Sequence, residues 1–214
     1  MGQLLFIKKF YKEILHTKGG NVENLFDTKG TIHDKIIKTL IKPLKNEKVK
    51  KILDAGSGKT SASILLKYFP EAEVDAVIYP GDNRKKNPLE TAIGSNRLNV
   101  EEADICEANI KKNYDLCVAH LTLGEATNFG NSFEKLFHKI VDMRAKHFII
   151  IDIWEDPCVH YRYIEQYLKE KGFKIIIKKK FRNPHPEHYP KVKYDKYKLE
   201  FDSHHYMSYL IRKI

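Results

Sequence analysis

Apolar residues recur with two different periods along the chain, and the change of period divides it. In 1–45 they fall at helical spacing, which predicts a helix over 4–15 and a second helix that begins near Thr31 and ends before Pro43. From residue 46 onward, short apolar runs alternate with helical stretches, as in chains that form a mostly parallel sheet. We therefore expect an N-terminal helical segment, 1–45, packed on an α/β core over 46–214.

Short apolar runs in the core region mark the strand candidates, at 51–54, 73–78, 98–102, 115–119, 147–153, 174–179 and 206–212. The stretches between them predict helices at 61–68, near 88–95, at 132–145 and at 161–171. No helix separates the last two strand candidates, which are joined by an insertion over about 182–203. The expected fold is α/β, a doubly wound, mostly parallel seven-stranded sheet with an antiparallel last strand, in a single structural domain.

Cysteine content and the N-terminal sequence bear on the compartment. The cysteines Cys106, Cys117 and Cys158 are odd in number and lack the spacing of metal ligands, which favours a reducing compartment. No secretory leader and no apolar run long enough to span a membrane is recognisable. We expect a cytoplasmic protein.

The net charge suggests a partner class. Lysine and arginine number 38 against 28 acidic residues, so the formal net charge is +10, a balance that favours encounters with a polyanion such as nucleic acid. A lysine-rich surface that serves only solubility explains the same number. Both interpretations stay open at this point.

The strongest chemical signal is the segment 54–60, Asp-Ala-Gly-Ser-Gly-Lys-Thr, which follows a buried strand and opens a helix. Glycines there let the backbone approach a bound ligand closely. The segment departs from the phosphate-binding loop motif, because Leu53 stands where that motif has its first glycine. It also misses the dinucleotide fingerprint, which needs glycine at Ser61. The segment predicts a nucleotide-type cofactor site.

Segment 54–58 resembles the first motif of class I S-adenosylmethionine-dependent methyltransferases, in which a strand ends in an acidic residue followed by a small-Gly-x-Gly turn. Segments 69–77, 103–106 and 114–125 are similar to the family's second strand, the acidic turn after its third strand, and its fourth strand with the following loop. The resemblance implies a Rossmann-like fold, S-adenosylmethionine as cofactor, and methyl transfer.

The resemblance also implies roles for single residues. Asp54 would bind the methionine amino group, Asp104 would accept a hydrogen bond from the adenine amino group, and Ile105 would cover the adenine ring. A carboxylate, polar acceptors and aliphatic cover are what this cofactor's groups require. The cofactor contacts expected in this way are Asp54, Ala55, Gly56, Ser57, Gly58, Tyr79, Asp82, Asp104, Ile105 and His120.

The sequence departs from the family at the end of the second strand. The family has an acidic residue there that binds both ribose hydroxyls, and the aligned residue here is Ile78. Either Asp82 takes over that role, or the ribose is held differently, or the site has lost the cofactor.

Candidate catalytic residues follow the fourth strand. The Asn/Asp-Pro-Pro-aromatic tetrad of enzymes that methylate exocyclic amino groups of nucleic acids is absent, and Cys158 lies after the fifth strand, where a cytosine C5 nucleophile is not expected. His120 and Glu125 remain as residues that could align the acceptor or remove its proton. A structural histidine and a helix-start carboxylate are the competing interpretations.

The substrate prediction rests on basic residues at and after the sixth strand. Lysine and arginine there alternate with aromatic residues, a composition suited to phosphates and stacked bases, and the predicted basic face is Lys178, Lys180, Arg182, Lys191 and Lys193. An exposed edge strand protected by lysines has the same pattern. We expect RNA, either rRNA or tRNA, as substrate, with a small molecule as the alternative.

Further alternatives concern the function itself. A non-catalytic binding protein could keep the fold without the cofactor, and a nucleotide-binding enzyme could use Lys59 and Thr60 on phosphates. His185 and His188 lie between prolines, so we predict an extended loop and no metal site there. The sequence carries no prediction of oligomeric state.

Overall fold

The structure, a computed structural model, describes residues 31–57, 61–80, 96–110, 112–123, 133–153, 161–184 and 205–214. The strands are β1 (Lys51–Ala55), β2 (Glu73–Ile78), β3 (Leu98–Glu102), β4 (Tyr114–His120), β5 (Ala145–Ile153), β6 (Phe173–Arg182) and β7 (His205–Lys213). The helices are α2 (Ile32–Leu40), the short 3-10 helix η2 (Lys42–Leu44), α3 (Ser61–Tyr68), α6 (Phe133–Val141) and α7 (Tyr161–Glu170). No helix among these segments is long and apolar enough to cross a membrane.

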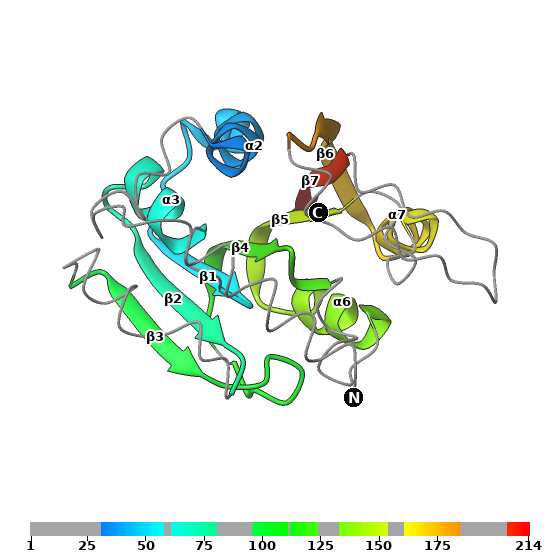
Figure 1. The fold of residues 1–214 in the computed structure, drawn as a ribbon. Coiled ribbons are helices and arrows are strands. Elements are labelled where there is room, and N and C mark those ends of the chain that lie inside the picture. The colour runs from blue at the N-terminus through cyan, green and yellow to red at the C-terminus, as the bar shows by residue number, and fades with distance from the viewer. Residues whose placement is uncertain are drawn as a thin grey trace, which may run out of the picture.

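The strands form one seven-stranded sheet in the order β3-β2-β1-β4-β5-β7-β6 (Figure 1). The first five strands of that order are parallel, and β7 runs antiparallel between β5 and β6. The strand order reverses between β1 and β4. In open α/β sheets, ligands bind at the carboxyl ends of the strands on either side of such a reversal.

Helices cover both faces of the sheet, with α2 and α3 on one face and α6 and α7 on the other (Figure 1). Two apolar clusters fill the spaces beneath them. One contains Ile37 and Leu65 with the sheet residue Val118, and the other contains Phe137 and Leu168 with Phe148. All six side chains are fully buried. The two faces supply the core that the alternating apolar pattern predicts.

The predicted α/β fold with an antiparallel last strand is confirmed, and α3 has the predicted bounds. Thr31 caps α2 as expected, since its side chain accepts a hydrogen bond from the backbone N–H of Asp34 at 3.1 Å. The helices predicted over 4–15 and near 88–95 lie outside the described residues. The single-domain prediction and the boundary near residue 45 stay predictions.

The largest differences from the predicted bounds are at the ends of α6 and β6. Helix α6 ends at Val141, not at Ala145, because Ala145 already pairs with Tyr114 in the sheet. Strand β6 continues to Arg182, because its pairing with β7 extends that far and buries Phe181. In both places a tertiary contact decides the boundary.

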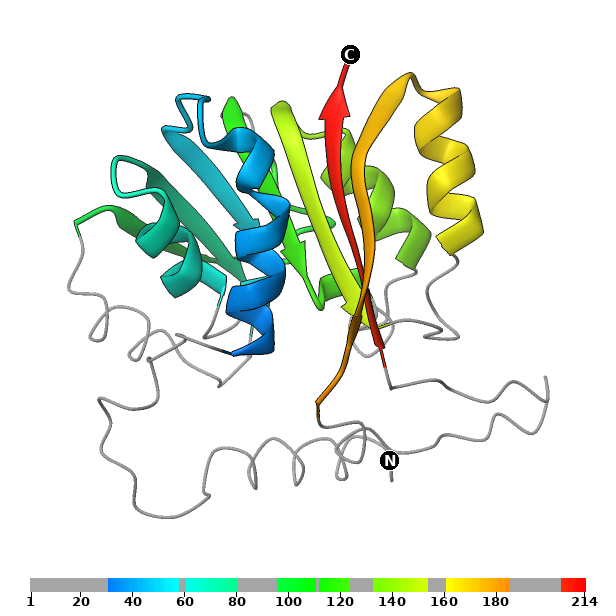
Figure 2. The ribbon, with the colours of Figure 1, turned by 90° about the horizontal axis from the view of Figure 1, so that it is seen from above.

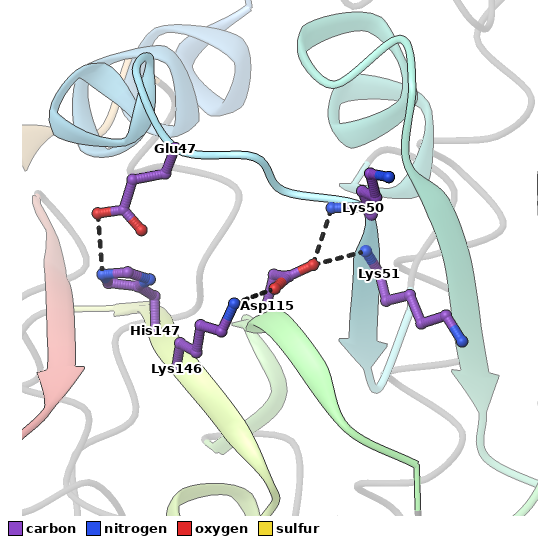
Figure 3. A network of polar contacts seen from close by, with 6 residues as sticks. All are labelled: Glu47, Lys50, Lys51, Asp115, Lys146 and His147. Atoms are coloured by element: carbon purple, nitrogen blue, oxygen red, sulfur yellow. Dashed lines mark hydrogen bonds and ion pairs between the residues drawn. The ribbon is translucent and has the colours of Figure 1, made fainter.

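At the amino edge of the sheet, one carboxylate ties three strands together (Figure 3). Asp115, in β4, accepts the backbone N–H groups of Lys50 and Lys51 at 2.9 and 3.1 Å, and its other oxygen accepts Lys146 Nζ at 2.7 Å. Partial burial would raise the pKa of Asp115, but the Lys146 ammonium and the two N–H groups outweigh it and hold the pKa below its usual range. The network fixes the start of β1 against β4.

Candidate cofactor and acceptor site

Asp54 occupies the carboxyl end of β1 and is fully buried. Its Oδ2 atom accepts the hydroxyl groups of Ser57 and Ser61, each at 2.6 Å. Ser57 lies in the turn after β1, and Ser61 is the first residue of α3, so the carboxylate joins both ends of the glycine loop. Asp54 therefore connects the turn after β1 to the start of α3.

The second oxygen of Asp54 is different. Oδ1 is buried and has no hydrogen-bond partner within the described segments. Burial raises the pKa of Asp54 to about 6, against the opposing effect of the two serine hydroxyls. Buried carboxylate oxygens normally accept a hydrogen bond. The site thus holds an acceptor that a ligand donor would complete.

Gly56 follows in the left-handed region, with φ at +76°. A Cβ atom added there would lie 2.3 Å from Thr122 Cγ2 and 2.8 Å from Thr122 Oγ1. Thr122 also donates its hydroxyl to the carbonyl of Ala55 at 2.9 Å. Only glycine can adopt this backbone conformation without strain and leave room for the Thr122 side chain. The loop after β1 and the segment after β4 are therefore packed directly against each other.

The segment after β4 contains one strained residue. Leu121 has φ at +57°, which costs a residue with a Cβ atom about 1–2 kcal/mol. Its backbone N–H donates to the carbonyl of Ile151 at 2.8 Å, and Thr122 follows with the hydroxyl bond to the β1 loop. Strain of this kind persists where neighbouring structure holds it, often beside functional groups. Here the positive φ of Leu121 changes the direction of the chain at the end of β4.

His120 is the last residue of β4, and the structure places its ring against α2. Its Nε2 atom lies 2.8 Å from Nδ1 of His33, and the two rings meet edge to face with centroids 4.7 Å apart. His120 is only 9% exposed. Burial lowers the pKa of His120 well below its usual value, and the pKa of His33 falls to about 4 for the same reason.

The ends of β2 and β3 form the other flank of the crevice. Ile78 is buried and stands in register with Glu102, an exposed carboxylate at the end of β3. Asp104 accepts the backbone N–H of Cys106 at 2.8 Å, which closes a turn after β3. Ile105 is buried in the core cluster on the α6 face. Tyr79, partly buried, follows Ile78.

Segments from distant parts of the sequence meet at the carboxyl edge of the parallel strands (Figure 2). Helix α2 begins at this edge, and β7 starts there as well, which brings His33 and Tyr206 to the same side as His120. Gly58, Asp82 and Glu125 lie outside the described residues, as do Lys59, Thr60, Cys158, His185 and His188.

The described part of the predicted basic face lies along β6. Lys178, Lys180 and Arg182 are exposed and, at every second position of a strand, share one face of it. Lys178 forms an ion pair with Glu165 of α7, with N and O atoms 2.7 Å apart, which offsets part of the charge. Lys191 and Lys193 lie outside the described residues.

Four residues of the site were not predicted from the sequence. Ser61 follows the predicted glycine loop, and Thr122 follows the predicted fourth strand. A hydroxyl residue in each of these places could have been recognised in the sequence. Glu102 could have been found by its register with Ile78. His33 had no signal, because its partner is 87 residues away in the chain.

The residues present fit S-adenosylmethionine. Its ammonium group could donate to Asp54 Oδ1, the buried oxygen that has no partner among the described residues. The left-handed turn at Gly56 follows Asp54 directly along the chain, and the carboxylates of Glu102 and Asp104 lie at and just after the end of β3. The fit is weakest at Ile78, which offers no hydrogen bond to a ribose.

No protein-family model matches the sequence, and no curated protein matches it. Solved structures do match. The N-methyltransferase NodS from Bradyrhizobium japonicum, solved with S-adenosyl-L-homocysteine, is 12% identical and aligns over 95% of this chain and 98% of its own, with a TM-score of 0.62. The proposed RNA methyltransferase PH1948 from Pyrococcus horikoshii is 15% identical over 92% of this chain and 91% of its own, with a TM-score of 0.60.

A third similar structure is the cyclase SpnF, 12% identical over 84% of this chain and 81% of its own, with a TM-score of 0.59. At identities this low, likeness shows a shared fold and leaves the reaction to the residues of the site. The chain has the fold of the class I S-adenosylmethionine-dependent methyltransferases.

Proposed function

We propose that the protein is an S-adenosylmethionine-dependent methyltransferase. The observation that carries the proposal is the cradle at the end of β1, where Asp54 keeps one buried oxygen without a partner among the described residues and Gly56 holds a left-handed turn against Thr122. Within this fold, that edge of the sheet is where a ligand binds. When bound, the cofactor supplies an activated methyl group.

The proposed contacts are those expected from the sequence, with Glu102 added. Asp54 would accept the cofactor ammonium, the Ala55–Gly58 turn would line its methionine part, and Asp104 and Ile105 with Tyr79 would flank the adenine. Either Asp82 or Glu102 would hold the ribose in place of an acid at Ile78, since Glu102 stands in register with it. His120 and Glu125 would face the methyl acceptor.

Calorimetric titration with S-adenosylhomocysteine tests the cofactor. We expect wild type to bind with micromolar affinity. The affinity of Asp54→Asn should be lower by at least about tenfold, because the amide carries no charge to pair with the ammonium. Asp115→Asn is the matched control, since it makes the same chemical change at the amino edge. Equal affinities in wild type and Asp54→Asn would contradict the proposed contact, and no binding by wild type would contradict the cofactor.

Protonation gives a second readout of the same contact. The pKa of Asp54 is raised to about 6 in the free protein, and an ammonium beside it would favour the ionised form. Binding should therefore release protons near pH 6 and tighten as the pH rises through that value. Titrations in buffers of different ionisation enthalpy measure this release, which Asp54→Asn should abolish.

RNA is the proposed substrate class, and the cytoplasm the proposed location. The net charge of +10 and the exposed Lys180 and Arg182 of β6 support RNA, and PH1948 is a proposed RNA methyltransferase of the same fold. Cys106 and Cys117 are buried free thiols, as expected in a reducing compartment.

The RNA proposal is tested by charge reversal. We expect Lys191→Glu with Lys193→Glu to weaken binding to total cellular RNA and to flatten its salt dependence, because fewer counterions are released. Lys45→Glu with Lys48→Glu, both exposed residues beyond the amino edge, is the charge-matched control. Loss in both double variants would indicate unspecific attraction, and loss in neither would favour a small-molecule substrate.

A further inference from the structure

Two histidines meet inside the molecule beside the proposed cofactor site. His33 of α2 and His120 of β4 approach to 2.8 Å between Nδ1 of the former and Nε2 of the latter. The ring of Tyr206, itself buried, packs edge to face on His33 with centroids 5.5 Å apart. Three elements therefore fix the geometry of the pair.

The contact must contain one shared proton. Two imidazole nitrogens can lie 2.8 Å apart only if one carries a hydrogen and the other a lone pair. Burial lowers the pKa of both rings, so the pair is neutral at pH 7. The nearest carboxylate along α2, that of Asp34, is engaged by Lys67 and Tyr68 at 2.9 Å each.

A neutral pair of this kind has two outer nitrogens of opposite character. One outer nitrogen is an acceptor and the other is a donor, because each ring carries one hydrogen. Since Nε2 of His120 faces His33, the outer atom of His120 is Nδ1, and that of His33 is Nε2. His120 lies two residues before Thr122, which contacts the glycine loop. Because His120 ends β4 at the carboxyl edge of the sheet, the pair lies beside the proposed cofactor site.

We propose that His120 and His33 form a proton relay that serves a hydroxyl methyl acceptor. His120 receives the proton, and His33 is a positioning residue that passes the second proton onward. This inference rests on the proposed methyltransferase function and adds the chemical class of the acceptor.

The relay balances in protons and electrons. The O–H proton of the acceptor moves to Nδ1 of His120, the Nε2 proton of His120 moves to Nδ1 of His33, and the Nε2 proton of His33 leaves to water. The new O–CH₃ bond forms as the S–CH₃ bond of the bound cofactor breaks, with its electron pair left on sulfur. Afterwards both rings are neutral with their tautomers exchanged. Once the product has left, Nδ1 of His120 loses its proton to water, the shared proton moves back to His120, and Nε2 of His33 takes a proton from water, which restores the starting state.

The ordinary basicity of an imidazole is enough to select the acceptor, because its conjugate acid has a pKa of about 6.5. A buried neutral imidazole cannot remove the proton of an alkylammonium group, whose pKa is about 10, before attack. An oxygen that gains a methyl group becomes strongly acidic and gives its proton to a weak base as the bond forms. A hydroxyl group is therefore the acceptor that matches the pair, whether in a ribose of RNA or in a small molecule.

Nuclear magnetic resonance of the full chain labelled with ¹⁵N-histidine tests the relay without an acceptor. In two-bond ¹H–¹⁵N spectra at pH 7.5, with and without S-adenosylhomocysteine, we expect both rings neutral, with the proton of His120 on Nε2 and Nδ1 bare. A proton on Nδ1 of His120, or a charged imidazolium in either ring, would overturn the proposal. Failure of wild type to bind S-adenosylhomocysteine would instead overturn the proposed function, and this inference with it.

Two variants separate relay from orientation. His33→Asn can still accept a hydrogen bond from His120 but cannot pass a proton on, and His33→Leu can do neither. With labelled S-adenosylmethionine and either total RNA or a small-molecule extract as acceptor pool, we expect both variants to lose at least about tenfold in methyl transfer while binding S-adenosylhomocysteine normally.

Full activity of His33→Asn with loss in His33→Leu would show that His33 only orients its partner, which overturns the relay. His138→Asn is the control, because His138 also contacts a side chain, Tyr163 Oη at 2.6 Å, on the α6 and α7 face. The acceptor pool that takes up label identifies the source of the hydroxyl.

Discussion

The two edges of the sheet each hold a carboxylate, partly buried at the amino edge and fully buried at the carboxyl edge, and the surroundings of the two are opposite. Asp115, at the amino edge, has both oxygens occupied by Lys146 and by backbone N–H groups, and its pKa is lowered. Asp54, at the carboxyl edge, is fully buried, has one oxygen without a partner among the described residues, and its pKa is raised to about 6. One carboxylate stabilises the fold, and the other is kept at a cost that a ligand could offset.

The largest expected effect comes from the turn beside Asp54. Gly56→Ala should lower the free energy of unfolding by about 2–4 kcal/mol, because it adds a strained φ and a Cβ atom 2.3 Å from Thr122. Gly172→Ala is the matched control, with φ at +74° and nothing within 4 Å of the added Cβ, and should cost about 1 kcal/mol. Urea unfolding measures both, and equal losses would show that the Thr122 contact does not matter.

The raised pKa of Asp54 makes the next prediction. Between pH 4 and pH 6 the folded chain binds this proton more tightly than the unfolded chain, so the ionisation of Asp54 lowers stability as the pH rises. Asp54→Asn should gain stability relative to wild type over this interval, on the order of 1–3 kcal/mol. A difference that does not change with pH would contradict the raised pKa.

Asp115 should behave in the reverse direction. Because the pKa of Asp115 is lowered in the folded chain, its ionised form stabilises the fold at pH values above the unfolded pKa of 3.8. This stabilisation is lost as the pH falls through the folded pKa. Asp115→Asn should therefore cost about 1–2 kcal/mol at pH 7 and less in acid. Thermal unfolding at pH 7 and pH 3 checks this. If the variant were as stable as wild type at pH 7, Asp115 would not stabilise the fold, and the two carboxylates would no longer differ in this respect.

The smallest effect is expected at Lys146. Its side chain is 70% exposed, so the ion pair with Asp115 is screened by solvent. Lys146→Ala should lower the free energy of unfolding less than any of the changes above, and the loss should shrink in high salt. A loss as large as that of Asp115→Asn would mean that the lysine, and not the backbone N–H groups, carries the network.

The fold was predictable from the sequence because its signals are local. Alternating apolar runs and helical stretches predicted the strands and the described α-helices, and the Asp54 to Gly58 spacing predicted that a turn follows β1. The ends of α6 and β6 were not predictable, because pairing in the sheet decides them.

The candidate site was predictable only in part, for a physical reason. His120 was found by its place after a strand, but the pair that it forms with His33 depends on how α2 lies across the sheet. The same holds for Thr122, whose methyl group makes glycine necessary at position 56. Contacts between distant segments leave no periodic pattern in either segment.

The position of β7 has a consequence for the order of assembly. Strand β6 reaches the sheet only through β7, which follows it in the chain and lies between β5 and β6. The parallel strands that carry Asp54 and His120 can therefore pair during synthesis while β6 still has no neighbour in the sheet. Residues 205–213 then act as the closing element, and the basic residues of β6 take their final place only after that strand has been made.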